Sequence, residues 1–158
     1  YLKTEEGLAT LHALIPHSHK SSFISAIRYL AVATAQKSSF AEVWKSLGKY
    51  VQDPERRWMI TIRQKRGLTD TSKPGGFTKD LVYFQGMVEV WQWLKENDFD
   101  ITNLYFGKMA KEDIDLALKL NPHFVPYLPS FFTLDQNKYA DAINEIRSLV
   151  QHVQTSHA

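Results

Sequence analysis

The sequence contains no cysteine and no long run of apolar residues. Without cysteine, neither a disulfide nor a thiolate metal site can form within these 158 residues. No apolar stretch approaches the roughly 18 residues that a membrane-spanning helix needs, and no signal peptide is recognisable. These absences predict a cytoplasmic protein that does not bind membranes. A hydrophobic content of 44% over 158 residues is enough for one domain with a buried core.

Charge is nearly balanced over the whole chain but not along it. The formal net charge is +2. Between positions 54 and 79, however, seven basic residues stand against two acidic ones, a local excess of +5. The basic residues are Arg56, Arg57, Arg63, Lys65, Arg66, Lys73 and Lys79. Such a segment suits an acidic or carboxylate-bearing partner, although a solvated helix face has the same composition. No nucleic-acid-binding motif accompanies it, so we do not expect a nucleic acid as partner.

Apolar residues recur with the helical period along most of the chain, which predicts a mainly α fold. The expected helices cover residues 5–15, 23–35, 40–47, 55–66, 79–96, 110–120 and 134–152. Their starts are marked by capping residues, namely Thr4, Ser38 or Ser39, Asp53 and Thr78. The β-branched run at 60–62 leaves a strand open there, and 101–106 is expected to be a short strand or irregular. Because no linker divides the chain, we expect a single helical domain or subdomain over residues 1–158.

Two glycines stand inside predicted helices. Gly7 follows Glu5-Glu6, and Gly86 interrupts the most apolar helix. Glycine costs about 1 kcal/mol in helix propensity relative to alanine, so each is expected to allow the close approach of another segment. The two carboxylates beside Gly7 could hold a metal ion. Alternatively, they only complement the dipole of a helix that Thr4 caps.

The segment 68–76 combines hydroxyl groups with glycine and follows two arginines. Arg63 and Arg66 are expected on one face at the end of the helix 55–66, next to a turn fixed by Pro74-Gly75-Gly76. Hydroxyls, a lysine and exposed backbone amides are suited to holding an anion. An ordinary ordered connector would have the same composition, and the spacing of a Walker loop is absent.

Several motifs, taken in order, resemble those of one family. Thr4-Glu5-Glu6-Gly7-Leu8-Ala9 is similar to the "[QE]EGLA" signature of a zinc metallopeptidase-like family. Its bacterial members are called flavohaemoglobin-expression-modulating QEGLA motif proteins, and its animal members are the microtubule-associated tyrosine carboxypeptidases. The further matches are Tyr50-Val51-Gln52-Asp53, Arg63-Gln64-Lys65-Arg66-Gly67, Thr69-Asp70-Thr71-Ser72-Lys73-Pro74-Gly75, Phe77-Thr78-Lys79-Asp80-Leu81-Val82-Tyr83 and Phe106-Gly107-Lys108. Together they span most of the chain, to about Pro129.

The resemblance implies a fold and a cofactor. The chain would be the C-terminal helical part of a zincin-like metallopeptidase domain, with Glu6 as the third zinc ligand, since it matches the invariant glutamate of the signature. In the family, two ligand histidines and the catalytic glutamate belong to an upstream HExxxH motif. None of the six histidines here is followed by glutamate. We therefore expect a C-terminal portion that binds zinc only together with the missing HExxxH segment and is not active alone.

A carboxypeptidase also needs groups that bind the terminal carboxylate of the substrate and the developing oxyanion. Arg63 and Arg66, helped by Lys79, are the candidates for the carboxylate, because a guanidinium matches two oxygens. Tyr83 is the candidate oxyanion donor. The substrate would be the C-terminus of a protein or peptide, such as an acidic tail. The alternative function is a helical interaction module without catalysis.

Overall fold

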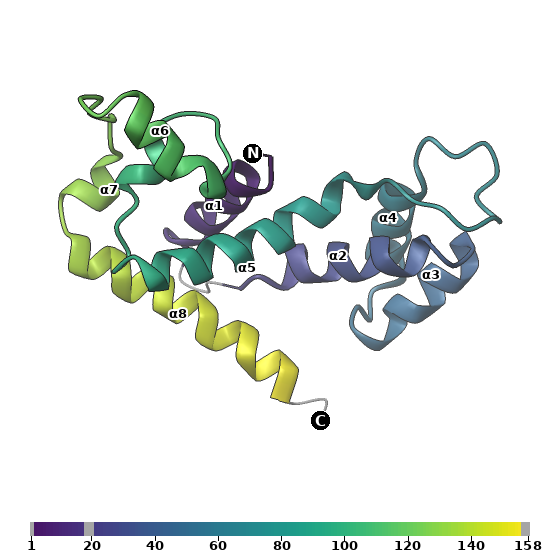
Figure 1. Cartoon of the computed structure of the whole chain (residues 1–158). Coiled ribbons are helices and arrows are strands. Elements are labelled where there is room, and N and C mark those ends of the chain that lie inside the picture. Colours follow the sequence, from purple (N-terminus) through teal and green to yellow (C-terminus); the bar gives the residue numbers. More distant parts are fainter. Residues whose placement is uncertain (1, 18–20, 156–158) are drawn as a thin grey trace. The chain divides into compact units, whose positions relative to one another are not determined.

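The computed structural model describes residues 2–17 and 21–155, with the side chains of the last helix described as far as Ile146. It is 68% helical, and no strand occurs in the described ranges, which confirms the predicted mainly α fold (Figure 1). The α-helices are α1 (Leu2–Leu14), α2 (Phe23–Ala35), α3 (Phe40–Ser46), α4 (Pro54–Lys65), α5 (Leu81–Glu96), α6 (Ile114–Leu120), α7 (Ser130–Thr133) and α8 (Gln136–Thr155). Short 3-10 helices are η1 (Leu47–Lys49), η2 (Thr78–Asp80), η3 (Thr102–Tyr105) and η4 (Lys111–Asp113).

The chain forms two compact units. The terminal unit comprises Tyr1–Ser22 and Gln85–Ala158, and the central unit comprises Phe23–Phe84. Helix α5 begins in the central unit and continues into the terminal unit. This division does not test the expectation of one domain over the chain, which stays a prediction. Among the described helices, none combines the length and the apolar character needed to cross a membrane.

Helices α2, α3 and α4 build the central unit. Its core consists of buried apolar side chains from α2, α3 and the segment just after α3, and Ile60 of α4 packs against them. These core residues are Ile27, Ala31, Ala35, Val43, Leu47 and Val51. Because Ala31 and Ala35 are small and fully buried, α4 can pack closely against α2 as well as α3.

Two helix starts in the central unit follow the sequence signals. Ser39, rather than Ser38, caps α3, and it forms a reciprocal capping box with Glu42. Asp53 caps α4, because its Oδ1 accepts the N–H of Glu55 at 2.9 Å, and Pro54 occupies the first helical turn. The predicted starts of α3 and α4 are therefore confirmed.

In the terminal unit, α1 and α5 cross at two glycines (Figure 1). A Cβ atom added to Gly7 would lie 2.1 Å from the carbonyl carbon of Gly86. A Cβ atom added to Gly86 would lie 2.1 Å from the carbonyl oxygen of Lys3. No side chain larger than hydrogen fits between these backbones. The expected close approach at each glycine is confirmed, and the segments that approach are the two glycine-bearing helices themselves.

Two predicted caps are wrong. Thr4 lies inside α1, which begins two residues earlier, and its buried hydroxyl instead accepts the N–H of Lys111 at 3.1 Å. Thr78 lies within η2, whose first flanking residue is Phe77 in an extended conformation without a side-chain cap. Helix α5 begins only at Leu81, so its start depends on the preceding 3-10 turn rather than on a hydroxyl.

Both places where a strand was considered are helical. The β-branched run around Thr61 belongs to α4, and the Thr61 hydroxyl donates to the carbonyl of Arg57 at 2.8 Å within the same helix. The segment 101–106 contains η3 rather than a strand. There, Oδ1 of Asp100 accepts from both the N–H and the hydroxyl of Thr102, at 2.8 and 2.5 Å. Such local bonds favour a turn over an extended chain.

Candidate functional site

The two units carry formal charges of opposite sign. The central unit has eleven lysines and arginines against five aspartates and glutamates, a formal charge of +6. The rest of the chain has eight against twelve, a formal charge of −4. Four of the predicted site residues, Arg63, Arg66, Lys79 and Tyr83, belong to the central unit, and Glu6 belongs to the terminal unit. The basic excess read from the sequence is thus a property of one compact unit.

Arg63 forms an ion pair that the sequence did not reveal. Its Nε donates to Oδ2 of Asp80 at 2.6 Å, and its Nη2 donates to Oδ1 at 2.9 Å. Nε2 of Gln64 donates to the same carboxylate at 2.9 Å, and Asp80 is fully buried. One N–H of Nη2 and both of Nη1 remain for another acceptor. Arg63 can therefore receive a substrate carboxylate only with part of its donor set.

The electrostatics of this pair keep both partners charged. Burial alone would raise the pKa of the Asp80 carboxyl, but the bonds from Arg63 and Gln64 outweigh it and hold that pKa below its usual value. The hydrogen bonds to Asp80 raise the pKa of Arg63. Tyr83 lies in the first turn of α5 and is half-buried.

Arg66 has a different environment from Arg63. Helix α4 ends at Lys65, Arg66 is extended, and Gly67 adopts a positive φ of 82°, so the two arginines do not share a helix face as expected. The Arg66 side chain is exposed, and its guanidinium carbon lies 3.7 Å from the centroid of the Phe77 ring. Stacking on an aromatic face orients a guanidinium while leaving its N–H groups at the edge for an anion. Arg66 is consequently the better placed of the two for binding a carboxylate.

A pocket of about 590 Å³ lies beside Arg66 in the central unit. The start of α3, the later turns of α4 and the loop after α4 surround it. Its apolar walls are Phe40, Trp58, Ile62 and Leu68. The rings of Phe40 and Trp58 meet edge to face, with centroids 4.7 Å apart. The pocket therefore joins an aromatic wall to a basic rim.

Lys65 holds the loop after α4 in place. Its side chain is only 1% exposed, and Nζ donates to the carbonyls of Ser38 at 2.5 Å and Lys73 at 2.8 Å. Burial lowers the pKa of Lys65. Because the Ser38 carbonyl follows α2 and the Lys73 carbonyl lies in the loop, one ammonium group ties these segments together. Lys65 is thus structural, although its charge contributes to the basic excess.

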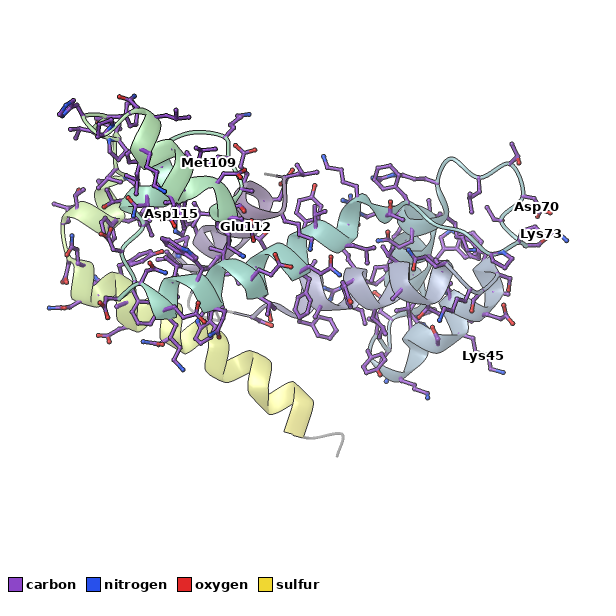
Figure 2. The ribbon with its side chains drawn as sticks, viewed as in Figure 1. Lys45, Asp70, Lys73, Met109, Glu112 and Asp115 are labelled. Carbon is purple, nitrogen blue, oxygen red and sulfur yellow. The ribbon has the colours of Figure 1, made fainter. Side chains whose placement is uncertain are left out.

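The loop amides are less available to an anion than the sequence suggested. The N–H of Ser72 donates to the side chain of Asp70 at 2.9 Å, and the N–H of Gly75 donates to the carbonyl of Ala35 at 2.8 Å. Figure 2 shows Asp70 and Lys73 close to the tip of this loop. Side chains at the base of the loop, above all Arg66, are therefore better placed than its backbone to bind a carboxylate.

In the terminal unit, α1 carries the two carboxylates of the signature on different sides. Thr4, Gly7 and other buried residues face the core, while Glu5 and Glu6 are half-buried. Glu5 lines a cavity of about 300 Å³ together with Met109, which Figure 2 labels beside Glu112. Glu6 does not line it. Of the two glutamates, only Glu5 borders this cavity, and the roles of both stay predictions.

An aromatic cluster around His12 escaped the sequence analysis. Nε2 of His12 lies 2.9 Å from the hydroxyl of Tyr139, and Nδ1 lies 3.5 Å from that of Tyr105. Burial lowers the pKa of His12 to about 4 and raises that of Tyr139. The imidazole is thus neutral near pH 7 and joins α1 to α8. The sequence feature that could have predicted burial of His12 is its position four residues after Leu8, on the same side of α1.

The residues present could supply only part of a zinc site. Within the described residues, no three His, Cys, Asp or Glu side chains gather into a group that could hold a metal ion. A single carboxylate can provide one of the three protein ligands of a catalytic zinc site. Glu6 fits zinc in that limited sense. Its role, like those of Arg63, Arg66, Lys79 and Tyr83, stays a prediction.

The central unit thus combines a net positive charge with a pocket whose aromatic wall is partly exposed. Comparison with known proteins identifies the family. The family model described as "Microtubule-associated tyrosine carboxypeptidase" matches residues 1–146. This chain therefore belongs to the microtubule-associated tyrosine carboxypeptidase family, in agreement with the resemblance of its motifs.

Similar proteins come from mammals. The chain is 40% identical over 129 residues to a mouse protein named putative tyrosine carboxypeptidase MATCAP2. The aligned region covers 77% of this chain and 25% of the mouse protein. It is 41% identical over 123 residues to human microtubule-associated tyrosine carboxypeptidase 1, and this alignment also covers 77% of this chain and 25% of the relative. The rat protein of that name is 34% identical over 157 residues, covering 97% of this chain and 31% of that protein. This chain thus spans a quarter to a third of these relatives.

Proposed function

We propose that this chain is the part of a zinc-dependent carboxypeptidase that supplies one zinc ligand, Glu6, and the surface that binds the C-terminus of a peptide. The observation that carries the proposal is the family match over residues 1–146, which includes the signature around Glu6 and the basic segment. Two histidines that this sequence does not contain would complete the ligand set. The proposed location is the cytoplasm, because the relatives are named for their association with microtubules.

Each group has a chemical task in this proposal. Zinc, when bound, polarises a peptide carbonyl and makes water more acidic. Arg66 binds the terminal carboxylate, with the free donors of Arg63 and the ammonium of Lys79 adding positive charge. The hydroxyl of Tyr83 donates a hydrogen bond to the oxygen on which negative charge develops. The contact that supports the task of Arg66 is its stacking on Phe77.

The substrate would be a protein or peptide with a free C-terminus. The formal charge of +6 on the central unit supports an acidic substrate, because complementary charge raises the local concentration of the partner. Neither a membrane nor a nucleic acid is part of this proposal.

The test compares the two neighbouring glutamates in the intact protein. Glu6→Gln should remove stoichiometric zinc and the release of C-terminal residues, because an amide is a poorer metal ligand than a carboxylate. Glu5→Gln should retain both and serves as the matched control. Zinc is measured by elemental analysis, and activity by mass spectrometry of a peptide with a free C-terminus.

Two results would count against the proposal. If Glu6→Gln kept a full equivalent of zinc, Glu6 would not be a ligand. If the wild-type protein held zinc but released no C-terminal residue from any free-acid peptide, the helical interaction module would be the better account of this chain.

A further inference from the structure

A groove in the terminal unit leaves apolar side chains in contact with solvent. It has a volume of about 640 Å³ and lies between the end of α1, α7 and the first turns of α8. Leu134, which joins α7 to α8, is 84% exposed, and Phe131 of α7 is 42% exposed. Ile15 and Pro16, just after α1, also line the groove. Apolar side chains exposed together within a polar rim are typical of protein interaction sites.

The aromatic side chains of this groove are held by contacts inside the terminal unit. Tyr139, which also lines the groove, is only 2% exposed, and its hydroxyl lies 2.9 Å from Nε2 of His12. The ring of Phe131 meets the His12 ring edge to face, with centroids 4.9 Å apart. Aromatic groups that are already fixed lose little conformational entropy when a ligand binds. The groove is therefore preformed.

The rim of the groove is acidic. Asp135, Asp141 and Glu145 line it against the single basic residue Lys138, which gives a formal charge of −2. Oδ1 of Asp135 already accepts the N–H of Lys138 at 2.9 Å. Asp141 is exposed, and within the described residues no basic side chain pairs with it. A ligand that fits must therefore carry positive charge beside an apolar surface.

The form of the groove narrows the class of ligand. Leu134 is too exposed for the groove to enclose a small molecule, because small-molecule sites bury most of the ligand surface. The groove lies between helices, so it offers no strand edge on which an extended peptide could continue a sheet. Its acidic rim repels an anionic membrane surface. An amphipathic helix, in contrast, binds such a groove through its side chains alone.

We propose that this groove binds an amphipathic helix of a partner protein. The apolar face of that helix lies on Leu134 and Phe131, and its flanking lysines or arginines lie beside Asp141. The lining follows α8 from its start to Glu145, which is about three turns or roughly 15 Å. That length suits apolar anchors at the i, i+3 or i+4, and i+7 positions of the partner. The inference goes beyond the proposed function, because none of the predicted site residues lines the groove.

The test measures binding of labelled synthetic peptides to the full chain by fluorescence anisotropy. The main peptide is a helix of about 16 residues, with leucines on one face and lysines on both sides of that face. One control peptide has the same composition with the leucines scrambled around the helix, and the other has glutamates in place of the lysines. The main peptide should bind at least about tenfold more tightly than either control, because only it matches both the wall and the rim.

Leu134→Asp tests the apolar wall. Its matched control is Val125→Asp, which changes an apolar residue of the same unit that is 85% exposed and does not line the groove. Leu134→Asp should weaken binding of the main peptide by roughly tenfold or more, and Val125→Asp should change it by less than about twofold. Leu134→Ser and Val125→Ser repeat the comparison without an added charge, and circular dichroism checks that each variant is folded.

Asp141→Lys tests the acidic rim. Its matched control is Asp115→Lys, at an exposed residue of α6 that Figure 2 labels and that does not line the groove. Because both substitutions change the net charge equally, the difference between them reports the local contact. Asp141→Lys should weaken the main peptide by roughly twofold to fivefold more than Asp115→Lys does. High salt should reduce this difference, because it screens exposed charges.

Equal binding of the main and scrambled peptides would overturn the inference, as would equal effects of Leu134→Asp and Val125→Asp. So would sedimentation of the wild-type chain as a dimer that Leu134→Asp dissociates, because a second copy would then occupy the groove. Neither zinc nor peptide hydrolysis enters these measurements. A failure here would leave the proposed function standing, and retention of zinc by Glu6→Gln would leave the groove standing.

Discussion

Replacing Gly86 by alanine tests whether the crossing of α1 and α5 is as close as the structure shows. At a solvent-exposed position inside a helix, replacing glycine by alanine would stabilise the protein by up to about 1 kcal/mol, because alanine has the higher helix propensity. At the crossing, the new Cβ would lie 2.1 Å from the carbonyl oxygen of Lys3 and 3.0 Å from the Cα of Gly7, whereas ordinary contacts begin near 3.4 Å. The propensity gain and the steric overlap therefore predict effects of opposite sign.

The overlap is the larger effect. Both contacting atoms belong to a backbone, so no side-chain rotation relieves the clash, and the helices must separate by roughly 1 Å. A gap of that size forfeits up to about half of the dispersion energy of the contacts around it. Overpacking of this kind costs about 1–3 kcal/mol, and the lost packing adds to it. After subtraction of the propensity gain of up to about 1 kcal/mol, and with the lost packing included, Gly86→Ala should lower the free energy of unfolding by about 1–3 kcal/mol.

Urea unfolding followed by circular dichroism measures this change, provided that the transition is two-state. Gly48→Ala is the matched control, because its Cβ would meet only the flexible end of the Arg57 side chain, with Nη1 at 2.5 Å and Cζ at 3.7 Å. The control should change the free energy of unfolding by less than about 1 kcal/mol. If Gly86→Ala were as stable as the control or more so, the helices would not cross at the two glycines.

The remaining predictions concern charged and titrating groups. Asp80→Asn should lower the free energy of unfolding by about 2–3 kcal/mol in urea titrations, because it leaves the partly exposed Arg63 without its buried partner. The control Asp70→Asn, which changes an exposed carboxylate, should lower it by less than about 1 kcal/mol. Equal effects of the two substitutions would show that burial of the ion pair does not matter. The pKa of His12 is about 4 in the folded chain against 6.5 in the unfolded one, so the unfolded state takes up a proton between these values. The contribution of His12 to the free energy of unfolding should therefore be fully present above pH 6.5. It should fall by roughly 2–3 kcal/mol as the pH drops to 4. His12→Gln should show a shallower pH dependence in the same titration, and an unchanged slope would contradict the assignment.

Local signals predicted most of the secondary structure. Asp53-Pro54 marked the start of α4, and Ser39 marked the start of α3, because a cap depends on atoms only two or three residues away. The glycines at the helix crossing were also visible, since glycine inside an apolar helix has a propensity cost that packing must offset. The prediction that Thr4 caps a helix failed for the opposite reason. Its hydroxyl accepts a hydrogen bond from Lys111, more than a hundred residues later, and no local rule includes such a contact.

The same limit applies to the candidate site. Asp80 could not be assigned to Arg63 from spacing, because the loop between them determines whether they meet. The pairing of His12 with Tyr139 joins the first and last helices, and only the folded chain brings them together. Residue type therefore predicted which groups could act, whereas long-range contacts decide which of them are already engaged.

Arg63 and Arg66 illustrate how this difference changes the argument about function. They are three residues apart and chemically identical, so the sequence favours neither. In the structure, a buried carboxylate already compensates the charge of Arg63 and takes two of its donor atoms. An incoming carboxylate gains less from a guanidinium that is already paired than from one that stacks on an aromatic ring and faces solvent. If the proposed function holds, Arg66 should thus contribute most of the carboxylate recognition, while Arg63 mainly holds Asp80.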